Sequence, residues 1–285
     1  MKKLMINVAY CSDSEGYFGL EASLYSLLTH TKGINFYIFT MDYSREEYGE
    51  LKEYHGLYPW QKNKLIKIVK YLDGKNSRIT FIDMHDTYQE LFVQGVNEFD
   101  GHSSPYAPLR LCWDLKFPHL DHVLYLDCDT IIQEDLTPMY WEYYEKIKQS
   151  PYCYCGFANP LGQNNEKKEE LVNSVVVFDL QKCYEHNYFA KVRWNLTHNF
   201  YQWYEQSAME DTEDYVRLPE TYNYMHLYEE RTYEPAILHF ACDLSPKVYH
   251  NRELFFKKYP HLKYIKDGLD ALDLIPINSK QYITD

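Results

Sequence analysis

Two carboxylates directly after a short apolar run are the residues of this sequence best suited to chemistry. The run, Val123–Leu126, is apolar and β-prone, which predicts a strand buried on both faces. Asp127 and Asp129 follow it, and residues two apart on a strand point to the same face. At the carboxyl end of a strand they would face the crevice in which open α/β sheets bind ligands. Because carboxylates this close repel each other, the spacing indicates a divalent cation that holds a phosphorylated substrate. The alternative is a polar turn that closes a core strand, with Asp129 capping the next segment.

Alternating strand and helix patterns surround this pair and predict the scaffold that positions it. The expected strands are Leu4–Tyr10, Ile34–Thr40, Arg78–Ile82, Val123–Leu126, Tyr152–Ala158, Val175–Leu180 and Ala236–Phe240. The expected helices are Tyr17–His30, Ser44–Tyr54, Trp60–Leu72, a segment from Ser103 to Lys116, a short aromatic helix after Pro138, and one or two helices in Gln181–Met209. Gly162–Glu170 is expected to be a polar loop and Leu218–Asn223 a turn or extended stretch. This order predicts an α/β fold with a mostly parallel sheet covered by helices on both faces.

Length, charge and cysteine usage exclude several classes of protein. A chain of 285 residues is long enough for one large domain with a sizeable core, and we expect a domain over residues 1–248 and a helical tail over residues 249–285. The net charge of −13 argues against a nucleic-acid binder. Seven cysteines without zinc-type pairing predict reduced thiols in a cytoplasmic protein. No run of about 18 apolar residues occurs, so no membrane-spanning helix is expected.

Further motifs occur around the acidic pair in a definite order. They are the loop Asp13-Ser14-Glu15-Gly16-Tyr17, Ser104-Pro105 followed by Arg110-Leu111, the segment His122–Ile132, Glu205-Gln206, Leu218-Pro219 with Asn223, and His239-Phe240 with Pro246. Each motif is weak alone, but together, from Leu4 to Pro246, they resemble glycosyltransferase family 8. This family of retaining enzymes includes bacterial lipopolysaccharide galactosyl- and glucosyltransferases and glycogenin. The resemblance implies a single Rossmann-like domain of the GT-A type.

The resemblance implies transfer of a hexose, galactose or glucose, from a UDP-sugar to a saccharide, glycolipid or glycoprotein acceptor. A bound Mn²⁺, or alternatively Mg²⁺, would offset the charge that builds on the diphosphate leaving group. Its protein ligands would be Asp127, Asp129 and His239, and carboxylate oxygens with one imidazole suit either cation. Taken alone, His239 would be interpreted as a satisfied core histidine, but its position at a strand end in the family's order favours a metal ligand.

The resemblance also assigns residues to the nucleotide-sugar donor. Tyr17 would stack on uracil and Asp13 would hydrogen-bond to the base or ribose, while Tyr10 of the first strand is expected to contribute to the same site. Asp127 would reach the ribose, and Arg110 the sugar or a phosphate. From residue types alone, Asp13 could equally be an ordinary loop residue, and Arg110 could belong to a structural ion pair.

The pair Glu205-Gln206 would lie beside the anomeric carbon. The family carries aspartate before the glutamine, so glutamate extends the carboxylate by about one methylene. Glu205 is the candidate nucleophile or charge-stabilising group. The sequence leaves both double displacement and same-face attack open.

Three departures from the family pattern concern donor contacts. Asn173, an expected sugar contact, is followed by Ser174 and Val175 without a glycine. Asn159 stands where an acidic residue is expected, and Lys247 is displaced by two positions from the expected diphosphate-binding lysine. These departures leave open a catalytically weak or self-glycosylating member that binds nucleotide sugars.

A different class of enzyme also places an Asp-x-Asp motif after a strand. In phosphatases of the haloacid-dehalogenase type the motif usually lies near the chain start, with a threonine two residues after the second aspartate. Here the motif lies mid-chain and Thr130 follows Asp129 directly. The spacing therefore favours the glycosyltransferase.

The C-terminal tail has two interpretations. It interleaves basic residues with aromatic ones, namely Arg252, Lys257, Lys258, Lys263 and Lys266 with Phe255, Phe256 and Tyr259. Such a segment could rest peripherally on an anionic membrane surface, near a lipid-linked acceptor. Alternatively, it is a packed terminal helix with a solvated basic face.

Overall fold

The computed structural model of the protein describes residues 5–47, 49–93, 95, 104–158, 172–201, 204–212, 215–225, 234–240 and 251–276. The strands are β1 (Ile6–Cys11), β2 (Ile34–Thr40), β3 (Tyr43–Glu47), β4 (Glu50–Tyr54), β5 (Arg78–Asp83), β6 (His122–Leu126), β7 (Thr130–Ile132), β8 (Cys155–Ala158), β9 (Val175–Asp179), β10 (Val216–Leu218), β11 (Tyr224–Met225) and β12 (Ile237–His239). The α-helices are α1 (Tyr17–His30), α2 (Pro59–Asp73), α3 (His85–Leu91), α4 (Trp113–Lys116), α5 (Thr137–Gln149), α6 (Leu180–Glu185), α7 (Tyr188–His198), α8 (Tyr204–Glu210), α10 (Arg252–Lys258) and α11 (Lys263–Asp273). Three short 3₁₀ helices are η1 (Ala107–Leu111), η2 (Glu220–Tyr222) and η3 (Pro260–Leu262).

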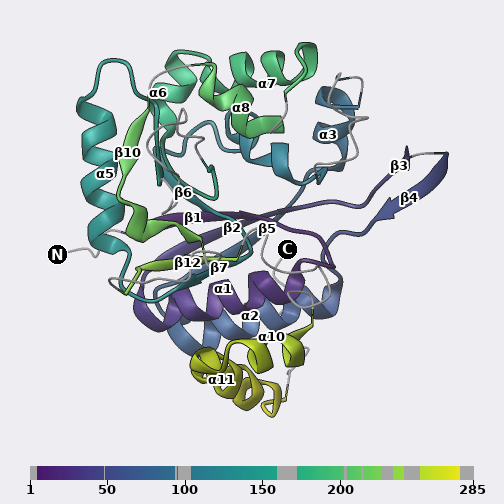
Figure 1. The fold of residues 1–285 in the computed structure, drawn as a ribbon, viewed down its shortest axis with the longest axis vertical. Coiled ribbons are helices and arrows are strands. Elements are labelled where there is room, and N and C mark those ends of the chain that lie inside the picture. The colour runs from purple at the N-terminus through teal and green to yellow at the C-terminus, as the bar shows by residue number, and fades with distance from the viewer. Residues whose placement is uncertain are drawn as a thin grey trace.

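A seven-stranded sheet runs through the molecule in the order β10-β8-β9-β6-β1-β2-β5 (Figure 1). Strand β1 is parallel to β2 and β6, β2 is parallel to β5, and β8 is parallel to β10. Only β9 among these strands runs antiparallel to its neighbours, β6 and β8. A smaller sheet, β11-β12-β7, lies beside it. The predicted α/β fold with a mostly parallel sheet is confirmed.

The central strands divide their side chains between two hydrophobic cores, one on each face of the sheet. Leu124 and Leu126 of β6 belong to the core that also contains α1 and α2, whereas Val123 and Tyr125 belong to the core that contains α7 and α8. Figure 1 shows these two groups of helices on opposite sides of the sheet. The Tyr125 hydroxyl donates to Asp127 Oδ1, so the Asp127 carboxylate lies on the α7–α8 side of the sheet although Asp127 itself follows the strand.

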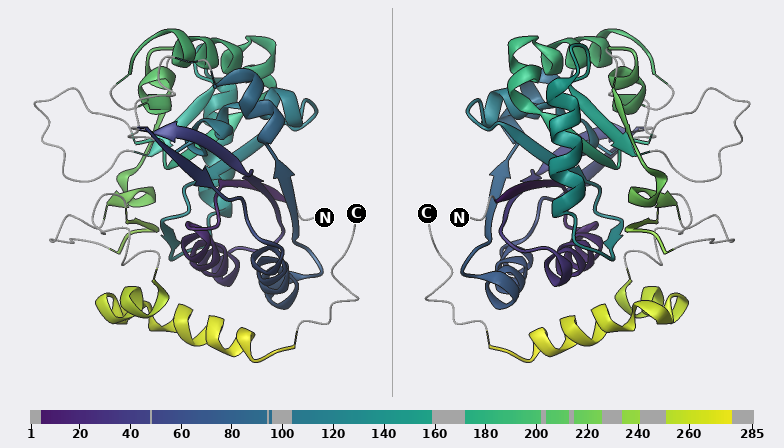
Figure 2. Two further views of the ribbon diagram at one scale, coloured as in Figure 1. Left: turned by 90° about the vertical axis from the view of Figure 1, so that its right-hand side faces the viewer. Right: turned by 90° about the vertical axis from the view of Figure 1, so that its left-hand side faces the viewer.

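The C-terminal helices α10 and α11 pack on the outer side of α1 (Figure 2). The ring of Phe18 in α1 contacts those of Phe255 and Phe256 edge to face, at centroid distances of 5.5 and 5.8 Å. Phe255 also lies 5.2 Å from Phe240, the residue after β12. Phe255, Phe256 and Tyr259 are all buried, as the packed-helix interpretation of the tail expects. Membrane contact by the tail stays a prediction.

This packing predicts that the tail stabilises the whole fold. We expect Phe255→Ala to lower the free energy of unfolding by about 3–5 kcal/mol, because it empties a fully buried site that the surrounding rings cannot refill. The matched control is Leu254→Ala at the neighbouring exposed position, for which we expect a change within about 0.5 kcal/mol. Urea denaturation followed by circular dichroism measures both. Equal effects of the two substitutions would contradict a packed tail.

The helix predicted over Ser44–Tyr54 is wrong. The segment forms the antiparallel hairpin β3–β4, which pairs Tyr43 with Tyr54 and projects from the body of the molecule (Figure 1). Gly49 has φ of 83° between the two strands, a conformation that glycine adopts without steric cost. At the base of the hairpin the rings of Tyr43 and Tyr54 stack at 6.3 Å. The Glu-rich composition favours a helix locally, and these turn and cross-strand contacts override it.

Two other helical predictions need correction. Gln181–Met209 contains parts of three helices rather than one or two, because Asn187 adopts a left-handed conformation (φ 54°) between α6 and α7, and Tyr204 does so (φ 48°) at the start of α8. Of the segment predicted from Ser103 to Lys116, residues 104–116 are described, and they contain the 3₁₀ helix η1 followed by the single turn α4, with Pro108 in the first turn of η1. The predicted polar loop Gly162–Glu170 lies outside the described residues. In the part of the chain that the structure describes, no helix is both long and apolar enough to cross a membrane.

Candidate active site

The acidic pair lies in the turn between β6 and β7. Asp127 and Asp129 therefore lie directly beyond the carboxyl end of a strand. The sequence argument, which used the direction of residues two apart on one strand, does not apply to them. The Asp127 N–H donates to the Ser174 carbonyl at 2.8 Å, and the Thr130 hydroxyl donates to the Asp127 carbonyl at 2.8 Å. These two bonds fix the turn against β9 and close it on itself, so both carboxylates project from a rigid backbone.

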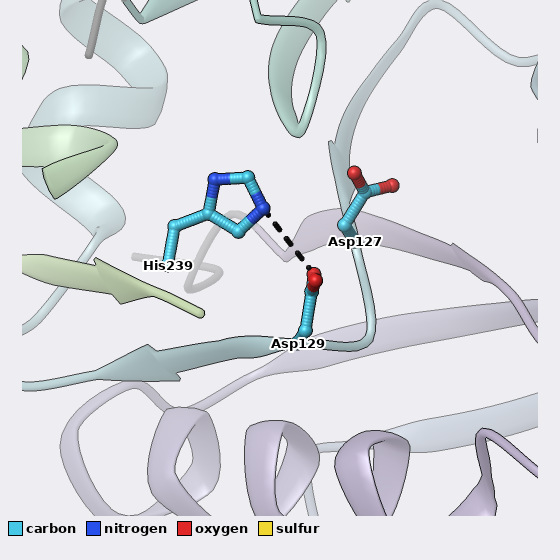
Figure 3. A group of neighbouring side chains, drawn as sticks. All are labelled: Asp127, Asp129 and His239. Carbon is cyan, nitrogen blue, oxygen red and sulfur yellow. Dashed lines mark ion pairs between the residues drawn. The ribbon is translucent and has the colours of Figure 1, made fainter. Parts of the chain in front are cut away.

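His239 reaches this turn from the smaller sheet. It ends β12, which runs antiparallel to β7 and places His239 opposite Thr130. The Phe240 N–H donates to the Asp129 carbonyl at 2.9 Å, which locks the end of β12 to the turn. His239 Nε2 lies 3.4 Å from Asp129 Oδ1 (Figure 3). One candidate ligand atom from each of Asp127, Asp129 and His239 lies within 4.8 Å of the other two.

The charges of this group reinforce one another. Burial raises the pKa of Asp129, but the adjacent His239, a backbone hydrogen bond and Arg110 together outweigh burial, so the carboxyl pKa lies below its ordinary value. Burial likewise lowers the pKa of His239, yet the Asp129 carboxylate raises it above the ordinary value. The buried His239 Nδ1 has no hydrogen-bond partner among the residues described. Two carboxylates and one imidazole, brought together from two sheets, fit the oxygen-rich donor set that Mn²⁺ or Mg²⁺ prefers.

Arg110 joins the acidic turn to a second group of buried polar residues, Glu205 and Asn173. Its guanidinium is almost fully buried, and Nη2 donates to Asp127 Oδ1 at 2.9 Å and lies 3.7 Å from Glu205 Oε1. Nη1 donates to the Asn173 carbonyl at 2.8 Å and Nε to the Ala107 carbonyl at 2.9 Å. Each guanidinium nitrogen thus has a protein partner. The structural ion pair left open from the sequence is present, and a donor contact by Arg110 stays a prediction.

Glu205 and Asn173 make up this second group. Glu205 is 7% exposed, and its Oε1 accepts a hydrogen bond from Asn173 Nδ2 at 3.2 Å. Burial raises the pKa of Glu205 above its ordinary value, and Arg110 offsets only part of that rise. Gln206 is oriented differently, because its Nε2 contacts Glu210 Oε1 at 3.5 Å. The structure therefore groups Glu205, but not Gln206, with the residues around Asp127.

The sequence model of "Glycosyl transferase family 8" matches residues 7–246, which include every residue of this site. The chain belongs to glycosyltransferase family 8. It is therefore a glycosyltransferase, as the sequence motifs predicted, and its central sheet with flanking helices has the GT-A arrangement.

Solved structures of other glycosyltransferases share this fold. The galactosyltransferase LgtC, in complex with donor and acceptor sugar analogs, superimposes with a TM-score of 0.64 at 14% identity over 95% of this chain and 98% of LgtC. The bifunctional glycosyltransferase WbbM superimposes with a TM-score of 0.61 at 15% identity over 92% of this chain and 50% of its own. Mouse xyloside xylosyltransferase 1 superimposes with a TM-score of 0.60 at 13% identity over 85% of this chain and 99% of its own. No curated protein sequence matches the chain significantly.

Tyr10 supports the acidic turn of this family 8 enzyme from behind. Its buried phenol lies 3.0 Å from the Ser23 hydroxyl, which lies 3.0 Å from the Thr130 hydroxyl. This chain of hydrogen bonds links β1 and α1 to the carbonyl of Asp127. A donor contact by Tyr10 stays a prediction.

The other predicted donor contacts lie apart from the metal-ligand candidates or outside the described residues. Asp13 Oδ1 accepts the Gly16 N–H at 2.5 Å, an ordinary loop contact that orders the start of α1. Tyr17 is buried, donates to Glu21 at 2.7 Å and meets Trp60 edge to face at 5.3 Å. Stacking of Tyr17 on uracil stays a prediction. Asn159 and Lys247, together with Pro246, lie outside the described residues.

Two residues that contact the site were not singled out from the sequence. The Tyr125 hydroxyl donates to Asp127 Oδ1 at 2.6 Å, and the Ser174 hydroxyl lies 3.2 Å from His239 Nε2. The spacing of Tyr125 and Asp127, two apart at a strand end, is a signal that could have identified the first. Ser174 could not have been found this way, because its position depends on the antiparallel register of β9 against β6.

Proposed function

We propose that the protein is a metal-dependent, retaining transferase that moves a hexose, galactose or glucose, from a UDP-sugar to a saccharide, glycolipid or glycoprotein acceptor. The observation that supports this most directly is the convergence of Asp127, Asp129 and His239 within 4.8 Å. Membership of family 8 supports the sugar transfer itself.

The reaction breaks the bond between the anomeric carbon and the β-phosphate oxygen and forms a bond to an acceptor hydroxyl. A divalent cation held by Asp127, Asp129 and His239 would supply positive charge to the diphosphate leaving group. His239 is buried and Asp129 is half-buried, and both lie on a locked turn and strand end, so they hold their positions without reorganisation during the reaction. Asp127 is partly exposed and would also contact the ribose.

Glu205 is suited to stabilise positive charge at the anomeric carbon. Its carboxylate lies in the same buried group as Arg110 and Asn173, where low polarity strengthens electrostatic interactions. In a double displacement Glu205 would be the nucleophile, and in same-face attack it would stabilise the ion pair. Both routes remain compatible with its position.

Calorimetric titration tests the proposed donor and cation. We expect UDP, UDP-glucose and UDP-galactose to bind in the presence of Mn²⁺, and to bind much more weakly or undetectably in EDTA, because the metal links the diphosphate to the two carboxylates. GDP-mannose should not bind under either condition. Binding of the uridine ligands that ignores EDTA would contradict the metal site, and equal binding of GDP-mannose would contradict the uridine donor.

A further inference from the structure

The carboxylate of Asp127 is held on one side only. The Tyr125 hydroxyl donates to Oδ1 at 2.6 Å and Arg110 Nη2 donates to the same oxygen at 2.9 Å. A carboxylate oxygen has two lone pairs in the carboxylate plane, so these donors occupy Oδ1. Neither Tyr125 nor Arg110 donates a hydrogen bond to Oδ2, so neither residue competes there with a bound cation. The Asp127 side chain is 24% exposed, which leaves the carboxylate accessible from solution.

The two donors also hold each other in place. The Arg110 guanidinium lies 4.0 Å from the centre of the Tyr125 ring, in a cation–π contact. Tyr125 is 1% exposed at the end of β6, and burial raises the pKa of its hydroxyl well above the ordinary value, so the group keeps its proton. Because neither donor can turn away, the orientation of the Asp127 carboxylate is fixed before any cation arrives.

We propose that Tyr125 is a positioning residue that restricts Asp127 to one metal-binding oxygen and thereby sets the affinity and selectivity of the cation site. This inference rests on the proposed metal-dependent function. Mn²⁺ and Mg²⁺ bind at short distances in octahedral sites, to which an aspartate contributes one oxygen. Ca²⁺ accepts both oxygens of a carboxylate, at longer distances and with more ligands. A carboxylate with one oxygen occupied therefore favours the smaller cations over Ca²⁺.

The substitution Tyr125→Phe removes one oxygen atom and leaves the ring in its core. Loss of a hydrogen-bond partner behind a metal ligand typically weakens metal binding 10–100-fold. We expect Mn²⁺ affinity, measured by electron paramagnetic resonance of free Mn²⁺, to fall by about 10-fold or more. We expect Ca²⁺ affinity, measured by competition, to fall less, because Oδ1 would keep only its bond from Arg110 and its second lone pair could then contact Ca²⁺ together with Oδ2. The ratio of Mn²⁺ to Ca²⁺ affinity should therefore decrease.

The matched control is Tyr184→Phe. Tyr184 also donates one hydrogen bond from its hydroxyl, to the Phe117 carbonyl at 2.9 Å, far from the acidic turn in sequence. We expect it to keep the wild-type affinities for both cations, and thermal melting of each variant reports any loss of stability. A purely structural role of Tyr125 would lower the melting temperature without changing the Mn²⁺/Ca²⁺ ratio, and that result would overturn the inference.

The experiment separates failure of this inference from failure of the proposed function. If wild-type protein binds no Mn²⁺, both are overturned. If wild type binds Mn²⁺ and Asp129→Asn does not, while Tyr125→Phe keeps the wild-type ratio, the metal-dependent function is supported and only the positioning role of Tyr125 is overturned.

Discussion

Asp129→Asn is expected to reduce sugar transfer by at least about 10³-fold while the protein stays folded, a loss of about 4 kcal/mol of transition-state stabilisation. The substitution keeps the size and shape of the side chain but replaces a charged oxygen ligand with a neutral amide. Because Asp129 is the carboxylate that contacts His239, its loss removes the centre of the three-residue group. A cation bound more weakly in this way would no longer offset the charge that develops on the leaving diphosphate.

The measurement is release of UDP from UDP-glucose and UDP-galactose in saturating Mn²⁺, with circular dichroism to show that the fold is kept. Asp121→Asn is the matched control, since Asp121 is exposed and precedes β6 at the opposite end of the same strand. We expect it to retain wild-type activity. Full activity of Asp129→Asn would mean that the carboxylate pair is a structural turn, the alternative that the sequence left open.

The strand ends that carry the metal-ligand candidates could be predicted from the sequence, because apolar β-prone runs lead up to them, whereas the choice of His239 as a ligand came from the family resemblance. Asp127 and Asp129 follow β6, and His239 ends β12, so the apolar runs alone placed them at strand ends. The geometric reason given for the pair was nevertheless wrong, because the two aspartates lie in a turn. They converge through the hydrogen bonds of that turn to Ser174 and Thr130 rather than through strand alternation.

The contacts that surround these residues could not be predicted, because they depend on tertiary register. The sequence left two roles open for Arg110, a structural ion pair and a contact to the sugar donor. The ion pair is seen only in the structure, where η1 approaches Asp127 and Asn173. Tyr17 was expected to face the nucleotide from its loop position. That role stays a prediction, and the edge-to-face contact of Tyr17 with Trp60 of α2, a residue more than forty positions away, could not be read from the sequence. The hairpin β3–β4 was missed for the same kind of reason, since its composition favours a helix in isolation.

Glu205→Gln is expected to lower sugar transfer by about 10²–10³-fold, since it removes the charge proposed to stabilise the anomeric carbon. The same substitution should stabilise the fold at neutral pH by about 0.5–2 kcal/mol, the range common for single stabilising substitutions. Burial raises the pKa of Glu205, so the folded protein holds this proton more tightly than the unfolded chain does. The wild-type protein therefore loses stability as pH rises from the ordinary carboxyl pKa to the raised pKa of Glu205. Above the raised pKa this loss is complete.

Glutamine at position 205 carries no charge, so the variant does not lose this stability, and its neutral carbonyl can still accept the hydrogen bond from Asn173. Arg110 keeps its bonds to Asp127 and to two carbonyls, so no buried charge is left without a partner. Urea denaturation from acid to neutral pH should show that the stability advantage of Glu205→Gln grows as pH rises and disappears below the ordinary carboxyl pKa. Glu145→Gln, at an exposed position of α5, should show neither effect. A variant that is less stable than wild type at neutral pH, or that transfers sugar at the wild-type rate, would contradict a buried carboxylate retained for catalysis.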